Sequence, residues 1–79
     1  METEKTTLKI IQRTLALEKT PDTASHLFDD LNAHHEELEN LREAINKEFN
    51  LEIEEADFQN LETIGQVVNL VKDYTNDIS

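Results

Sequence analysis

The pattern of apolar and polar residues begins with a helix. From about Thr3, apolar residues recur at steps of three and four, the spacing that places side chains on one stripe of an α-helix. The residues on this stripe and beside it are Leu8, Ile10, Ile11, Leu15 and Leu17. We therefore predict a first helix that turns this stripe toward a core.

The helical pattern stops in residues 18–32. This stretch holds Pro21, the only proline, among many turn-forming residues. We expect three apolar residues to pin it to the core as a loop, namely Leu27, Phe28 and Leu31. A loop of about fifteen residues is uncommon in a compact domain and is often functional.

A second helix is predicted over residues 33–49. Its apolar positions are separated by three, four and four residues and are Leu38, Leu41, Ile45 and Phe49. Asn32 is placed to cap the first turn, and glutamates near the start of the helix suit the positive end of its dipole.

The remaining chain predicts two more helices. Residues 54–60 fit a short helix among acidic residues. Thr63 and Gln66 then form the pattern of a capping box, which marks the start of a last helix reaching to about Tyr74. Its apolar stripe is Ile64, Val67, Val68, Val71 and Tyr74. The valines would also suit a strand, but the capping box and the spacing favour a helix.

These elements predict one all-α domain covering residues 1–79, a small four-helix bundle with a long loop between helices one and two. Eighteen acidic residues against seven lysines and arginines give a net charge of −11. Such a charge repels nucleic acid and anionic membranes, so neither is an expected partner. It favours partners with basic surfaces, although solubility alone would also explain it.

Other features of the composition narrow the expected class further. The chain has no cysteine, which excludes disulfides, thiolate metal sites and a cysteine nucleophile. No apolar run approaches the roughly 20 residues of a membrane span. We expect a soluble, cytoplasmic and monomeric protein.

Five segments in this order resemble acyl carrier proteins: KII at 9–11, FDDLNA at 28–33, AINKEF at 44–49, LEI at 51–53 and LETIGQVV at 61–68. The resemblance covers nearly the whole chain and implies the acyl-carrier type of four-helix bundle. In that family an Asp-Ser-Leu motif opens the second helix, and its serine carries phosphopantetheine.

The resemblance places that motif on His34, His35 and Glu36, so that His35 stands where the attachment serine is expected. A stable phosphodiester to the flexible phosphopantetheine arm needs a hydroxyl oxygen, whereas an imidazole gives at best a labile phosphoramidate. The family's preceding glycine is matched by Asn32, which tolerates left-handed backbone angles. We therefore expect no phosphopantetheine cofactor.

Acidic residues also replace the apolar residues that the family shows around the arm. The predicted docking face for basic partner surfaces is Glu36, Glu37, Glu39 and Glu43. The sequence thus predicts an acyl-carrier-like module without its attachment serine, acting as a docking or regulatory protein in a fatty-acid or polyketide-type pathway.

Two alternatives remain open. Ser25 is a candidate for a displaced attachment site, although a local turn in the loop explains it as well. His34, His35 and Glu39 invite a metal site, since His35 and Glu39 are four residues apart on a helix. Solvated surface histidines are the simpler interpretation, and His26 is the only other imidazole. No paired acid, base or nucleophile predicts catalysis, so we expect no enzyme activity.

Overall fold

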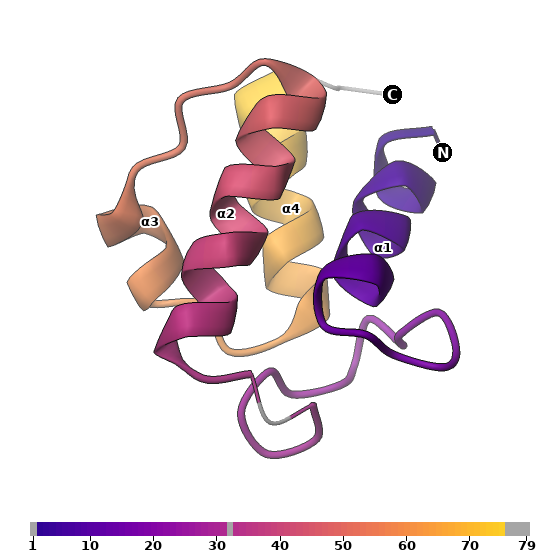
Figure 1. The fold of residues 1–79 in the computed structure, drawn as a ribbon. Coiled ribbons are helices and arrows are strands. Elements are labelled where there is room, and N and C mark those ends of the chain that lie inside the picture. The colour runs from indigo at the N-terminus through magenta and orange to yellow at the C-terminus, as the bar shows by residue number, and fades with distance from the viewer. Residues whose placement is uncertain (1, 32, 76–79) are drawn as a thin grey trace.

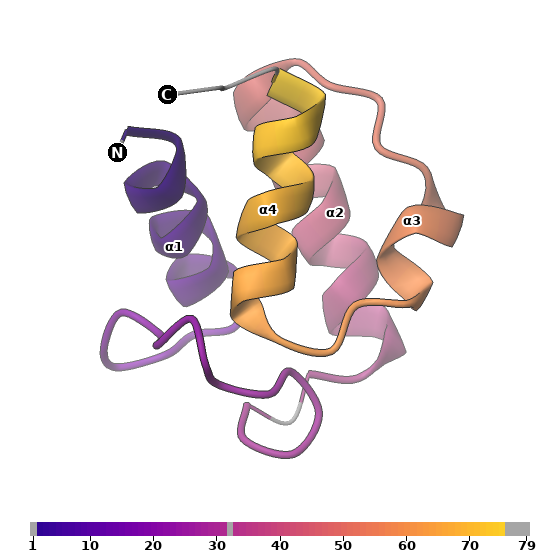
Figure 2. The same cartoon turned by 180° about the vertical axis from the view of Figure 1, so that it is seen from behind.

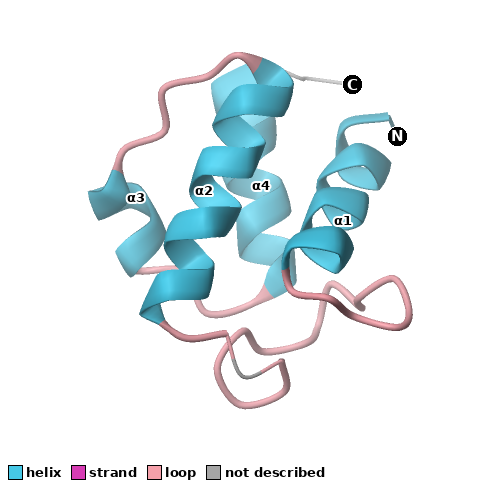
Figure 3. Ribbon diagram, viewed as in Figure 1, coloured by secondary structure: helices cyan, strands magenta, loops and turns pink. Residues whose placement is uncertain are grey.

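The protein folds as a small bundle of four helices. A computed structural model describes residues 2–31 and 33–75. The helices in chain order are α1 (Glu2–Thr14), α2 (His35–Phe49), α3 (Glu55–Gln59) and α4 (Ile64–Thr75) (Figure 1). The predicted all-α bundle, with its long loop between the first two helices, is therefore confirmed. Figure 3 shows helices and loops throughout the described residues.

The three longer helices form the body of the molecule. Helix α1 runs in the opposite direction to α2 and α4, which lie one behind the other (Figures 1 and 2). Short α3 lies beside α2, on the side away from α1. Among residues 2–31 and 33–75, no helix has the length and apolar character needed to cross a membrane.

The core consists of aliphatic side chains from α1, α2, α4 and the connecting segments, with one aromatic ring from α3. In α2 the buried residues are Leu41 and Ile45, both fully shielded, while Leu38 and Phe49 are partly buried. The predicted apolar stripes supply most of the core, which is Ile10, Ile11, Leu27, Ala33, Leu41, Ile45, Ile53, Phe58, Ile64, Val67, Val68 and Val71. Tyr74 departs from its predicted stripe, since it is 38% exposed.

Helix α1 ends earlier than its apolar pattern suggested. Ala16 adopts a left-handed conformation with φ of 55°, and the Leu17 N–H donates to the Gln12 carbonyl at 2.9 Å. This closure ends the helix at Thr14. Leu15 and Leu17 therefore lie beyond the helix, although both still pack against the core.

Helix α2 starts two residues later than predicted. His34 occupies the N-cap position with an extended backbone, and its side chain makes no capping bond. Ala33, expected inside the helix, is instead buried below the loop, where its N–H donates to the Leu27 carbonyl at 2.8 Å. The predicted cap, Asn32, lies outside the described residues.

The later helices agree closely with the sequence pattern. Helix α3 is one residue shorter at each end than predicted. At the start of α4, the Gln66 N–H donates to Thr63 Oγ1 at 3.3 Å, and the Thr63 N–H donates to Gln66 Oε1 at 3.0 Å. This reciprocal pair confirms the predicted capping box.

The long loop is fastened to the segment that precedes α4. The Leu27 N–H donates to the Glu62 carbonyl at 2.7 Å, and His26 and Thr63 form an isolated antiparallel bridge. Among the expected anchors Leu27 is buried and Leu31 partly buried. Phe28 as an anchor is wrong, because its side chain points outward and is 43% exposed.

Gly65 allows a second backbone contact between the loop and α4. Its N–H donates to the Thr23 carbonyl at 2.8 Å. A side-chain carbon at this position would lie 3.1 Å from the same carbonyl oxygen. A glycine therefore permits the close approach that holds the loop against the first turn of α4.

Candidate functional site

The N-terminal end of α2 holds the residues that the sequence singled out. His34 leads into the helix in an extended conformation, His35 is its first residue, and Glu36 follows. All three are exposed, and the side chain of His35 is 76% accessible. The position expected to carry a serine therefore presents an accessible imidazole at the start of a helix.

A shallow pocket lies beside His35, between α2 and α3. Its lining residues are His35, Leu38, Glu39, Glu55, Phe58 and Gln59. The cavity volume is about 20 Å³, which is room for roughly one water molecule. Glu55 Oε1 lies 4.0 Å from His35 Nε2, and both residues line the pocket. The pocket in this conformation is too small to enclose an acyl chain.

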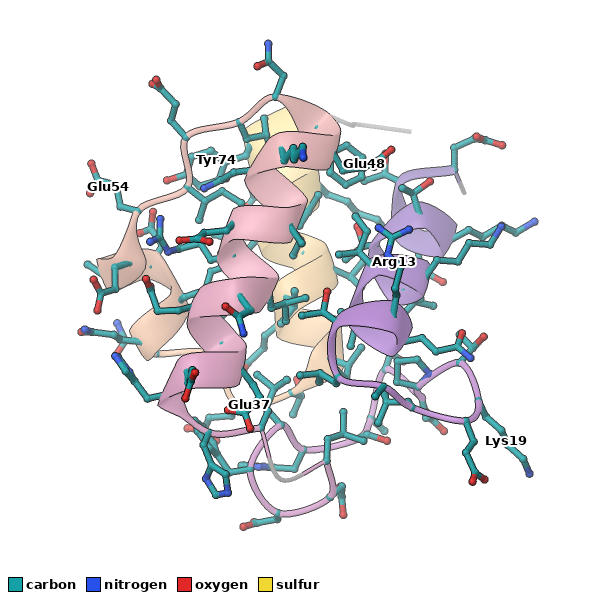
Figure 4. The ribbon with its side chains drawn as sticks, in the orientation of Figure 1. Arg13, Lys19, Glu37, Glu48, Glu54 and Tyr74 are labelled. Carbon is teal, nitrogen blue, oxygen red and sulfur yellow. The ribbon has the colours of Figure 1, made fainter. Side chains whose placement is uncertain are left out.

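The predicted docking carboxylates differ in their availability. Glu36 and Glu43 are exposed, whereas Glu37 and Glu39 are partly buried. Figure 4 shows Glu37 at the end of α2 that adjoins the long loop. Since α-helical residues advance by about 100° each, Glu36, Glu39 and Glu43 share a stripe and Glu37 lies beside it.

Glu39 is held by an arginine that the sequence analysis did not single out. Arg42 Nε donates to Glu39 Oε1 and Nη2 to Oε2, both at 3.1 Å. This two-bond pairing fixes the Glu39 carboxylate and neutralises its charge. The three-residue spacing of acid and base on a helix was the available signal. Glu36 and Glu43 are thus the freely available carboxylates of the stripe.

Arg42 also belongs to a clamp on the connection between α2 and α3. Its Nη1 donates to the Ile53 carbonyl at 3.0 Å. Asn46 pairs with the backbone of the same residue, accepting from its N–H at 2.9 Å and donating to its carbonyl at 3.2 Å. These bonds satisfy the backbone of buried Ile53 and place α3 next to His35.

A second polar contact ties α3 to the end of α4. The Tyr74 hydroxyl donates to Asp57 Oδ2. This hydrogen bond, together with burial and the charges of Asp57 and Glu54, raises the pKa of Tyr74 above its ordinary value. Figure 4 shows Tyr74 and Glu54 on this side of the molecule. The proton on Tyr74 is therefore part of the contact between the two helices.

Ser25 lies in the long loop, ten residues before α2 begins. It is partly buried, and its backbone is used twice: its N–H donates to the Asp22 carbonyl at 2.9 Å, and its carbonyl accepts from Ile64 at 3.0 Å. The loop assignment is therefore confirmed, and Ser25 does not open a long helix that continues to Phe49.

The histidine pair gathers no complete set of metal ligands. His34 and His35 are both exposed, as surface histidines are. Glu39, the proposed third ligand, is engaged by Arg42. Across residues 2–31 and 33–75, no three His, Cys, Asp or Glu side chains converge in a way that could hold an ion.

Comparison with known proteins adds no relative from which a role could be transferred. No family model matches the chain, and no significant match is found among curated proteins. The functional argument therefore rests on the residues and their geometry.

Proposed function

We propose that the protein is an acyl-carrier-like module that lacks its attachment serine and acts by docking. Its role would be that of a docking or regulatory protein in a fatty-acid or polyketide-type pathway. The observation that carries this proposal is the exposed His35 at the first position of α2, at the end of the long loop and beside α3. The resemblance expects an arm-bearing serine at this position.

The residues around this position do not suit phosphopantetheine. A phosphodiester to the arm requires a hydroxyl, and His35 supplies an imidazole. Glu36 and Glu37 follow it directly, so that an incoming phosphate would meet two carboxylates. The adjoining pocket has room for about one water molecule. Together these features favour a module that carries no arm.

Docking is supported by the charge that remains available on α2. Glu36 and Glu43 are exposed on one stripe, on a chain with a net charge of −11. Complementary potentials accelerate encounter with a basic partner surface and help to select it. The helix that would have carried the arm therefore retains the charge needed to meet a basic enzyme surface.

The first test asks whether the chain accepts the arm. After incubation with coenzyme A and a phosphopantetheinyl transferase, we expect the intact mass of the protein to remain unchanged. The triple variant His34→Asp, His35→Ser, Glu36→Leu is expected to gain the mass of one arm. An arm on the unaltered chain would contradict the proposal, and its loss in Ser25→Ala would then identify the displaced site.

The second test asks whether the chain still docks. We expect it to inhibit arm loading of a functional acyl carrier protein by the same transferase, in competition with that substrate. The double variant Glu36→Gln, Glu43→Gln should inhibit several-fold less. Glu48→Gln, Glu52→Gln is the matched control, because both residues are exposed and lie away from His35. Equal loss in both variants would mean that net charge, rather than the α2 stripe, is recognised.

A further inference from the structure

The long loop contains a histidine whose ring acts as a hydrogen-bond acceptor. The N–H groups of Phe28 and Asp29 both donate to His26 Nδ1, at 3.2 and 3.3 Å. A ring nitrogen accepts only when it carries no proton, so the imidazole must be neutral, with its proton on Nε2. The side chain of His26 thus caps the turn that begins at its own residue.

Carboxylates surround this neutral ring. Asp29 Oδ2 lies 3.9 Å from Nδ1, and Glu62 Oε2, from the segment before α4, lies 3.9 Å from Nε2. Asp30 is the third acidic residue of the site, and its Oδ2 accepts from the His26 backbone N–H at 2.7 Å. The ring therefore has two ion-pair partners within reach as soon as it gains a proton.

The two protonation states of His26 require different arrangements. A proton on Nδ1 would face the N–H groups of Phe28 and Asp29, donor against donor, and both bonds would be lost. The same proton creates a charge that Asp29 and Glu62 attract. Protonation therefore exchanges two bonds that hold the turn for ion pairs that do not require its present shape.

We propose that His26 is an acid-sensitive latch on the backbone N–H groups of Phe28 and Asp29. The Asp30 and Leu31 N–H groups donate to the His26 carbonyl at 3.0 and 3.1 Å and hold the rest of the turn in either state of the ring. With a neutral ring, the latch holds the Phe28 and Asp29 N–H groups in place. In acid, the imidazolium turns toward Asp29 and Glu62 and releases the backbone of Phe28 and Asp29. Imidazole is the side chain whose charge ordinarily changes between about pH 5 and 8.

The release has a defined structural range. Phe28 is 43% exposed, and its ring lies 6.0 Å from that of His26. Its N–H is one of the two groups that the ring releases. Leu27, by contrast, is fully buried and bonded to the Glu62 carbonyl, so the loop remains attached to the body at that residue. The change is therefore local to the turn and moves an exposed aromatic ring near the start of α2.

The test is an NMR titration of the whole chain between about pH 5 and 8. At the upper end, nitrogen shifts of the imidazole should report the neutral ring with its proton on Nε2. The amide signals of Phe28 and Asp29 should move with the titration of this ring, and their protection from exchange should fall about tenfold in acid. A neutral ring protonated on Nδ1, or amides that ignore the ring's titration, would overturn the proposal.

Two variants separate the latch from a general effect of acid. In His26→Asn, the amide oxygen can accept the same N–H groups but cannot be protonated in this range, so the turn should stay closed throughout. In His26→Ala, the two amides should be poorly protected at every pH. The matched control is His34→Asn, His35→Asn, which removes the other two histidines and should leave the titration of Phe28 and Asp29 unchanged. A persistent pH response in His26→Asn would refute the latch.

Discussion

The body of the molecule, formed by α1, α2 and α4, and the α3 segment, formed by α3 with its connections in residues 50–63, are held in place by different interactions. The body is joined by aliphatic residues that are fully buried, among them Ile11, Ile45 and Val71. The α3 segment contributes Ile53 and one ring, Phe58, to that core, and Leu51 and Leu61 pack against it. Side-chain hydrogen bonds add to this packing and fix the position of the segment. The stabilisation from buried apolar surface is non-directional and shared among many contacts. Hydrogen bonds are directional, and a substitution can remove them one at a time.

His35 lies where these two regions meet. It belongs to α2, yet Glu55 of α3 is 4.0 Å from its ring, and Phe58 lines the pocket between them. The position of the α3 segment therefore determines what surrounds His35. We predict that variants in the body will lower the stability of the whole domain, whereas variants in the α3 segment will act mainly around His35.

The largest effect is expected from the body. Ile45→Ala should lower the free energy of unfolding by about 2–5 kcal/mol, because truncating this fully buried side chain of α2 leaves a cavity in the core. Urea denaturation measures this loss. Asn40→Ala, on an exposed face of the same helix, is the control and should have little effect. If Ile45→Ala lowered the free energy of unfolding by less than about 1 kcal/mol, the distinction between the body and the α3 segment would not hold.

The next effect concerns the clamp that Arg42 and Asn46 form on the α3 segment at Ile53. Asn46→Ala leaves the N–H of buried Ile53 without its acceptor, which should cost about 1–3 kcal/mol. Hydrogen exchange should show faster exchange at Ile53 and around α3, with α1 little changed. Asn69→Ala, an exposed asparagine of α4, is the matched control. If the Ile53 amide stayed fully protected from exchange in Asn46→Ala, the Asn46 side chain would not be what holds the α3 segment in place.

A smaller effect is expected at Thr63, where the α3 segment leads into α4. Thr63→Ala removes the hydroxyl that accepts from Gln66 in the capping box of α4 and should cost about 1 kcal/mol. Thermal unfolding followed by circular dichroism measures the change. Thr23→Ala alters an exposed threonine of the long loop and should be nearly silent. Equal effects in the two variants would show that the capping box adds no stability.

The smallest effect is a change in titration rather than in global stability. The bond to Asp57 favours the protonated phenol, so the raised pKa of Tyr74 contributes stability below about pH 10. That contribution is lost as the pH rises through the folded-state pKa. Asp57→Asn should move the ultraviolet titration of Tyr74, the only tyrosine, toward lower pH. Glu52→Gln is the control, and an unchanged midpoint in Asp57→Asn would contradict the contact.

The helical body was predictable because its signals are local. Apolar spacing identified the buried face of α2, and the sequence of Thr63 and Gln66 identified the start of α4. Helix ends were less accurate where the backbone took an unusual course, as at Ala16, whose left-handed angle no periodicity signals. The same limit applies at Ala33, whose burial depends on the folded loop rather than on the helix.

The candidate site was only partly predictable, since much of it is assembled from distant segments. The order of motifs led to His35, and its exposure agrees with a surface role. The pairing of Arg42 with Ile53 and the approach of Glu55 to His35 join residues from different elements. The acceptor role of His26 depends on how the turn folds back onto its ring. Such contacts follow from the tertiary fold and leave no periodic trace in the sequence.

The bridge between His26 and Thr63 also has a kinetic consequence. It joins the loop before α2 to the segment before α4, so a long stretch of chain must be closed before the bridge can form. Closing a long stretch costs chain entropy, which slows the formation of contacts between distant residues. We expect the middle of α2 to acquire structure early and the loop leading to His35 to become ordered late, after α4 has docked.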